Sequence, residues 1–458
     1  MKFTNKHITL FLLSFFLMAG SVFAQETTDR DLQYFTSPDQ RGLNQFEAPF
    51  TTDIEFDGVQ VRIGGSNAIQ FQGISQENTG DPYYAGKDDQ GNPIFKTLPN
   101  LESNFNLATS NLDLDVGLAN GLRMHLRTYL TSQHHTEAYV KSGYMQVDRL
   151  DFISEGLASG LMDNVRIKVG HMELNYGDNH FRRSDNGSAI HNPFVGNYIM
   201  DSFTTEVAGE IYYYSGNMFG MIGVSNGKLN QHVTDKAANG FKTHATLYGK
   251  LGFDSQINDD MRFRLTGSIL NVAQSASIYL YSGDRAGSRY YSVMDDGFRA
   301  GRFAPSFTPG YGQAPAPGEM TAFMINPFIK YNGLEFYGVF ENTSGNISGN
   351  DSRTFNQYGA ELLYRFGADE DFYLGGRYNL VSGETTGGDI EIDRINIGGG
   401  WFLTKNVMAK LEYVTQSYSG EGFTGTRGFA PGVAPSNLTN KYKDGKFNGV
   451  MMEAIISF

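Results

Sequence analysis

The chain has 458 residues, a formal net charge of −13 and no cysteine. The lack of cysteine excludes disulfides, thiolate-ligated metals and covalently attached haem, and the acidic balance argues against nucleic acid as a partner. The chain is rich in aromatic residues (14%) and holds 55 glycines but only one tryptophan. The overall hydrophobicity is modest. This composition is typical of strands whose side chains alternate between lipid and water.

The first 24 residues predict a secretory signal peptide. Lys2 and Lys6 precede the apolar run "ITLFLLSFFLMAG", and the small residues Val22 and Ala24 fit cleavage after Ala24. Beyond this run we find no apolar stretch long enough to cross a bilayer as a helix. Residues 25–58 are polar and show no alternation, so we interpret them as a periplasmic N-terminal extension or a small plug.

Alternation of apolar and polar residues begins at Val59 and continues to the end of the chain. It predicts an all-β fold, a transmembrane antiparallel β-barrel of about 16 strands over residues 59–458 in the Gram-negative outer membrane. Short connections, such as Asn120–Gly121, alternate with long polar segments, which is the known asymmetry between periplasmic turns and extracellular loops. An even strand number places both termini in the periplasm. One connection, "DFISEGLASGLM", is long for a periplasmic turn.

The last ten residues, "GVMMEAIISF", form an alternating strand with one apolar face. An unpaired apolar strand at the edge of a sheet invites aggregation. A closed barrel would use this strand as its last one, with the apolar face toward lipid. We therefore predict that Ile456 and Phe458 form an assembly signal.

Basic residues follow the polar face of two predicted strands. Arg123 and Arg127 alternate with apolar residues in "LRMHLRTYL", as Arg166 and Lys168 do in "VRIKVG". Lipid accommodates unpaired charges only at high cost, so these side chains are expected to face the lumen. A barrel of this size is wide enough for an aqueous channel. The alternative is equally open: these charged side chains would do no more than keep the inner wall hydrated and form salt bridges along it.

The third extracellular loop, about Met172 to Thr204, is expected to fold into the lumen. It is rich in turn residues and carries the aromatic anchors Tyr176, Phe181 and Phe194. Arg182 and Arg183 of this loop would then constrict the channel beside the basic wall. Fixed basic groups in a narrow pore favour anions, so an anion preference is the resulting hypothesis.

Three stretches carry a family resemblance, "RTYLTSQHHTEAYVKSGYMQVDRL", "KVGHMELNYGDNHFRRSDNG" and "NPFVGNYIMD". They resemble outer-membrane porins of Bacteroidota and, more distantly, the phosphate-selective porins. The resemblance covers roughly Arg127 to Asp201 and implies a sixteen-stranded barrel with an inward third loop, an arginine-lined lumen and passive diffusion of small solutes. Phe458, with its alternating approach, is similar to the recognition signal that the barrel assembly machinery reads.

Other motifs point to weaker alternatives. "GVSNG" at Gly223–Gly227 has the spacing of a nucleophile elbow, but a polar loop follows it where that motif needs a helix, so no enzyme is expected. Two histidine groups have the composition of metal ligands: His134 and His135 with Glu137, and His171 and His180 with Glu173. Ordinary polar loop histidines are the favoured interpretation, and neither a metal nor a cofactor is expected.

The leading functional prediction is an outer-membrane porin for passive diffusion of small hydrophilic or ionic solutes, with anion preference. The alternative is a plugged barrel that anchors periplasmic or surface partners. An energised transporter would need a far larger plug than residues 25–58 supply. The solute and the oligomeric state stay open, and a homotrimer is one alternative.

Overall fold

The structure is a computed structural model that describes residues 32–130, 138–185, 187–229, 233, 242–281, 290–294, 301–305, 307, 317–347, 352–385, 387–423 and 441–458. The predicted signal peptide lies outside these residues. The strands are β1 (Gln60–Glu77), β2 (Tyr83–Lys87), β3 (Pro93–Lys96), β4 (Asn104–Ala119), β5 (Leu122–Leu130), β6 (Tyr139–Val147), β7 (Val165–Glu173), β8 (Thr205–Ser215), β9 (Met218–Ser225), β10 (Thr246–Asn258), β11 (Met261–Ser275), β12 (Gly318–Tyr331), β13 (Leu334–Ile347), β14 (Arg353–Phe366), β15 (Phe372–Thr385), β16 (Gly388–Thr404), β17 (Val407–Ser419) and β18 (Lys446–Ser457). The helices are α2 (Ser159–Met162) and the short 3-10 turns η1 (Gln40–Gly42), η2 (Asn179–Arg182), η3 (Ala189–His191) and η4 (Glu421–Phe423).

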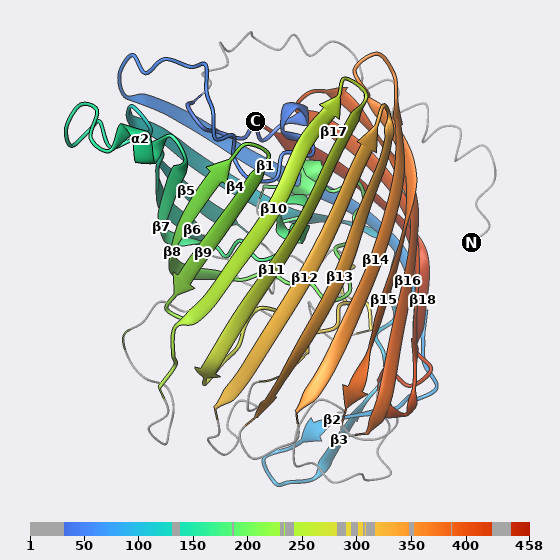
Figure 1. The fold of residues 1–458 in the computed structure, drawn as a ribbon. Coiled ribbons are helices and arrows are strands. Elements are labelled where there is room, and N and C mark those ends of the chain that lie inside the picture. The colour runs from blue at the N-terminus through green and yellow to red at the C-terminus, as the bar shows by residue number, and fades with distance from the viewer. Residues whose placement is uncertain are drawn as a thin grey trace.

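Sixteen of the described strands, β1 and β4 to β18, close into one antiparallel barrel, as predicted (Figure 1). Strands β2 and β3 form a separate hairpin within the first long connection. Closure takes place between β18 and β1, whose register runs from Ser66 opposite Ser457 to Glu77 opposite Lys446. The Phe458 amide donates to the Gly65 carbonyl at 3.0 Å, and the Gly65 amide donates back at 2.9 Å. The predicted role of the C-terminal strand as the closing strand is confirmed.

The outer surface is apolar, as the alternation predicted. Large aliphatic side chains such as Ile222 and Leu251 stand exposed on the strands, while their neighbours in sequence point inward. Near the short turns, four rings form a stacked row along three strands: Tyr364, Phe366, Phe372 and Trp401, with successive centroids 6.1, 5.6 and 5.6 Å apart. Such a row is the aromatic girdle of a lipid-facing barrel. Among the described residues, no helix is both long and apolar enough to span a membrane.

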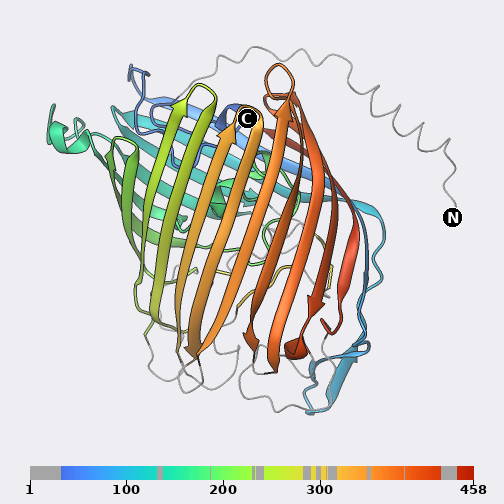
Figure 2. The ribbon, with the colours of Figure 1, turned by 45° about the vertical axis from the view of Figure 1, so that its right-hand side comes forward.

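The short turns that follow β4, β8, β10, β12, β14 and β16 gather at one end of the barrel (Figure 2). The connection between β6 and β7, residues 148–164, is long although it lies at this same end, and the connection between β15 and β16 is short although it lies at the opposite end. The third loop, between β7 and β8, folds into the lumen, as predicted. There the Val195 amide donates to Glu412 on β17 at 2.7 Å, and the Ile199 amide donates to Asn379 on β15, also at 2.7 Å. This segment places its own apolar residues inside the barrel.

The interior differs from the open aqueous lumen that we expected. Residues of the third loop, such as Ile199 and Met200, are buried in one hydrophobic cluster with wall residues from β7 to β18 and with Ile74 of β1. Tyr290 and Phe303, from the connection between β11 and β12, belong to the same cluster. A large part of the lumen is therefore a packed core, because the long loops carry apolar side chains that the wall alone would leave exposed.

The closing pair generates the first prediction. Replacing Ile456 by Asp puts a carboxylate on the lipid-facing side of β18, which costs up to about 2–4 kcal/mol for a midplane charge and less for Asp or near the interface. Deleting Phe458 removes the two backbone hydrogen bonds to Gly65. We expect both variants to lose most of the heat-modifiable folded form in outer-membrane fractions. Ile456→Val, which keeps the apolar surface, is the control. Normal amounts of folded barrel from both altered chains would contradict this role of the last strand.

Candidate functional site

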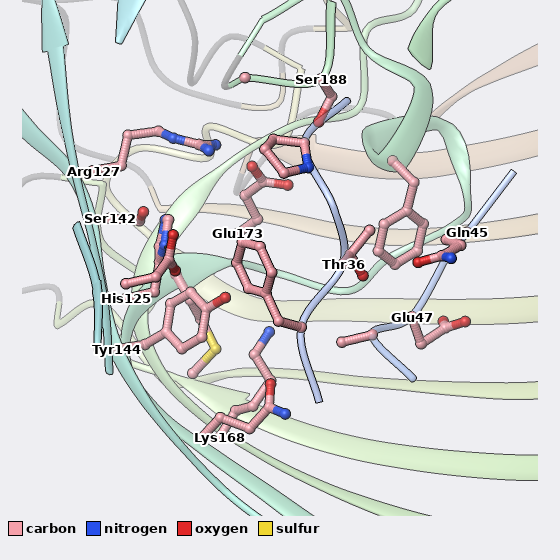
Figure 3. A pocket seen from close by; sticks show the side chains of 18 of the residues that line it. Thr36, Gln45, Glu47, His125, Arg127, Ser142, Tyr144, Lys168, Glu173 and Ser188 are labelled. Carbon is pink, nitrogen blue, oxygen red and sulfur yellow. The ribbon is translucent and has the colours of Figure 1, made fainter. Parts of the chain in front are cut away.

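A charged cavity of about 210 Å³ lies between one side of the barrel wall and the N-terminal segment (Figure 3). Its wall side comes from β1 and β4 to β8, and its inner side from residues 35–48 and the third loop. In Figure 3, His125, Arg127 and Lys168 extend from the wall, while Thr36 and Gln45 come from the N-terminal segment opposite. The described residues thus leave polar space along one side of an otherwise packed interior.

Two carboxylates on β4 organise the basic wall. Arg127 makes a two-pronged contact with Asp113, with nitrogen–oxygen distances of 2.7 and 2.6 Å. Asp115 faces three basic groups: its oxygens lie 2.7 Å from His125 Nδ1, 3.7 Å from an Arg62 nitrogen and 3.9 Å from an Arg123 nitrogen. One carboxylate opposite two guanidinium groups leaves an excess of positive charge at this point of the cavity wall.

Arg166 and Lys168 complete the same wall from β7. Arg166 is buried, donates to Asp148 at 2.6 Å and donates to the backbone carbonyls of Ala48 and Pro49 in the N-terminal segment. Lys168 is more exposed: its Nζ lies 3.5 Å from Glu210 and 4.6 Å from the centre of the Tyr144 ring. Arg166 therefore serves mainly to hold the segment, whereas Lys168 is available to the cavity.

Arg182 and Arg183 lie elsewhere. They do not line the cavity with the other four predicted residues. Arg182 pairs with Glu361 on β14 at 2.5 Å, and Arg183 holds Asp201 of its own loop at 2.7 Å. Both guanidinium groups also lie over aromatic rings, so the third loop uses them to attach and fold itself. The structure thus separates the six predicted residues into four at the cavity wall and two in the packed interior.

The N-terminal segment, residues 32–50, crosses the end of the barrel that carries the short turns. Gln33 accepts a hydrogen bond from the Gly121 amide in the turn between β4 and β5. The Gln40 amide donates to Lys405 in the turn between β16 and β17 at 2.8 Å. The chain then returns across the interior, where Phe46 is buried against Phe181 and Phe328. The segment is therefore fixed to both sides of the barrel mouth.

Glu47 is the central attachment of this segment. Its carboxylate lies 2.9 Å from Lys250 on β10 and 2.7 Å from Arg264 on β11, and both bases also pair with Asp178 of the third loop. Burial opposes ionisation, yet Arg264 and Lys250 lower the pKa of Glu47 to about 2. The same two bases overcome burial to lower the pKa of Asp178. Four buried charges thus join the wall, the loop and the N-terminal segment.

The described histidines do not assemble a metal site. His180 has its ring nitrogens 3.0 Å from Glu173 and 3.1 Å from Asn175, but His171 is not part of this group. Among the described residues, no cluster of three or more histidine and acidic side chains has the arrangement of a metal site. His134, His135 and Glu137 lie outside the described residues.

His191 joins the third loop to the N-terminal segment. Its Nε2 lies 3.1 Å from the Asp39 carbonyl, across the gap between η3 and η1. Burial lowers the pKa of His191 to about 4, despite the opposing effect of Asp39. The imidazole is consequently neutral at physiological pH and adds no fixed charge to the cavity that it lines.

Four residues that shape the cavity were not among the predicted ones. Arg62 alternates with apolar residues on β1, as Asp113 and Asp115 do on β4, so their inward orientation could have been inferred from the same pattern. Glu47 has no comparable signal, because it lies in a segment without alternation and finds its partners about 200 residues away.

The chain matches no protein-family model and no curated protein sequence. Among solved structures, it is similar to OmpT of Vibrio cholerae in its trimer form, with 10% identity over 88% of this chain and 100% of that one and a TM-score of 0.51. It is also similar to an anion-selective porin from Comamonas acidovorans, with 11% identity over 87% of this chain and 100% of that one and a TM-score of 0.51. The fold is that of a sixteen-stranded outer-membrane barrel. With its apolar exterior, the chain is a multi-pass barrel of the Gram-negative outer membrane.

The Glu47 network generates the second prediction. Glu47→Gln should loosen the N-terminal segment, because removing one partner of a buried ion pair costs about 3–5 kcal/mol. We expect trypsin to cut the folded barrel after Arg41 at least about tenfold faster than in the unaltered protein. Glu55→Gln, which changes an exposed acid just beyond the segment, is the matched control. Equal cleavage rates for all three proteins would show that Glu47 does not hold the segment.

Proposed function

We propose that the chain forms a narrow outer-membrane channel through which small hydrophilic solutes diffuse passively. The observation that carries this proposal is the charged cavity along one side of the closed barrel, between the wall and the N-terminal segment. A packed interior would have no reason to leave Arg62 and Lys168 partly exposed on this side. A channel along this cavity would admit small solutes and exclude large ones.

The finer proposal is a modest preference for anions. Most wall charges that face the cavity are paired. The anion preference therefore depends on the excess positive charge at Asp115, where two arginines share one carboxylate. It depends also on Lys168, whose ion pair with Glu210 is longer. Fixed charges act strongly in a narrow pore because little water screens them. Arg182 and Arg183 do not take part in this proposal.

We further propose that residues 25–58 act as a small plug, through the described segment 32–50. Its hydrogen bonds to two turns, the burial of Phe46 and the Glu47 ion pairs support this role. The same observations favour a second candidate function, a fully plugged barrel that serves as an anchor for periplasmic or surface partners. Conductance separates the two functions, since an anchor carries no steady current.

Selectivity provides the third prediction. The double variant Arg62→Gln, Lys168→Gln removes two positive charges from the cavity wall. We expect the anion-to-cation permeability ratio to fall at least about twofold, which corresponds to roughly 0.4 kcal/mol. The zero-current potential across a KCl gradient in a planar bilayer measures this ratio. Lys330→Gln changes a partly exposed lysine that does not line the cavity and is the control. A potential that stays constant in the double variant would refute the proposed selectivity wall.

Deletion of the plug provides the fourth prediction. If residues 25–50 are removed, so that the signal peptide leads directly to Thr51, the cavity loses its inner side. We expect the single-channel conductance to rise roughly twofold or more. Removal of residues 88–92, the exposed tip of the β2–β3 hairpin, is the control. If the full-length barrel carries no current and conducts only after the deletion, the result favours the anchor. If the conductance is unchanged by the deletion, the segment does not limit the pore.

A further inference from the structure

The connection between β6 and β7 carries an exposed apolar surface at the barrel end with the short turns. This connection, residues 148–164, contains α2 and is hereafter the foot. Four of its large apolar side chains are exposed to solvent: Phe152 43%, Ile153 64%, Leu157 41% and Leu161 59%. Scattered single exposures need no explanation, but four within ten residues mark a contact surface.

The inner side of the foot packs against the lipid-facing side of the wall. Leu122 on β5 lies opposite Val147 on β6, and Val147 lies opposite Ile167 on β7, so these residues share the outward face. Val165, also on this face, is only 9% exposed because Met162 of the foot covers it in a small hydrophobic cluster with Val147. The foot therefore occupies a position on the outside of the barrel that lipid would otherwise fill.

The position of the foot determines what its other side meets. Figures 1 and 2 both show the segment with α2 projecting sideways from the barrel wall rather than along the barrel axis. The foot adjoins an exposed apolar part of the wall, because Met145 on β6 and Val169 on β7 are also exposed on the outward face. A surface that is mounted on the membrane-facing wall and points sideways faces the bilayer.

The length of the adjoining strands gives a reason for such a surface. β6 and β7 have 9 residues each. At about 3.3 Å per residue and a tilt of about 40°, each strand spans roughly 23 Å of membrane, slightly less than the apolar band of about 25 Å in such barrels. Additional apolar surface at the end of these strands would compensate for the mismatch.

We propose that the foot is a membrane-docking element that inserts Phe152, Ile153, Leu157 and Leu161 into the interfacial region of the periplasmic leaflet, where phospholipids cover it. Apolar side chains on one side of a short element, at the level of the headgroups, bind a bilayer in this way. The proposal depends on the position of the barrel in the membrane and not on whether the barrel conducts.

The lack of cysteine in the chain allows a direct test with single labelled positions. Ile153→Cys and Leu157→Cys would each carry an environment-sensitive fluorophore in vesicles of phosphatidylethanolamine and phosphatidylglycerol. Ile222→Cys, on the exposed wall of β9, is the lipid-facing control, and Asp259→Cys, in the turn between β10 and β11, is the water-facing control. Heat modifiability confirms that each labelled protein is folded.

We expect lipids with a nitroxide near the headgroup to lower the emission of both foot probes at least about twofold, and a nitroxide deep in the acyl chain to affect them less. The Asp259 probe should respond to aqueous iodide instead. If both foot probes behave like the Asp259 probe, the foot lies in water and the proposal is wrong. If lipid quenchers have no effect and the emission of the foot probes rises on dilution with unlabelled protein, a second copy covers the foot, which also overturns the proposal.

Discussion

The architecture depends on one constraint, that no backbone amide or carbonyl within the hydrocarbon layer is left without a partner. In an antiparallel sheet this is possible only when the last strand pairs with the first, as β18 does with β1 over twelve residues. Closure fixes the even strand number and brings both chain ends to the side of the short turns. It also forces each strand into alternation, since one face of every strand meets lipid and the other meets the interior.

A second constraint then shapes the interior, because buried charges need partners. Inward bases on the wall pair with inward acids, as Arg377 does with Glu361 and Lys410 with Glu453. Uncharged polar side chains of the wall bind the backbone of the inserted loop. Gln357 accepts a hydrogen bond from the Met200 amide, and Asn326 accepts one from the Asp178 amide. The wall thus provides hydrogen-bonding partners for segments that enter the barrel, which explains how a loop without regular strands can be fixed inside it.

These constraints explain what the sequence could predict. Alternation is a local property, so the strands, the closing role of β18 and the inward position of Arg123, Arg127, Arg166 and Lys168 follow from neighbouring residues. The inward course of the third loop followed from its aromatic anchors. The partners of that loop could not be predicted, because Arg182 meets Glu361 at a separation of 179 residues and no local pattern indicates the pair. For the same reason, the attachment of Glu47 and the extent of the packed core were not evident.

The two sides of the interior differ in how closely the inserted segments pack against the wall. Apolar residues of the third loop and of the β11–β12 connection pack mainly against the wall from β7 to β18, with Ile74 of β1 in the same cluster. The cavity lies against β1 and β4 to β8, where the third loop and the N-terminal segment leave Arg62 and Lys168 partly exposed. A charged group can be left beside water at little cost, whereas covering it with an apolar side chain removes its hydration without a substitute. The packed side also carries wall charges, but Arg377 and Lys410 there pair with wall acids and donate to carbonyls of the inserted loop. The partners that each charged side chain finds, and not the number of charges, therefore separate the packed side from the cavity side.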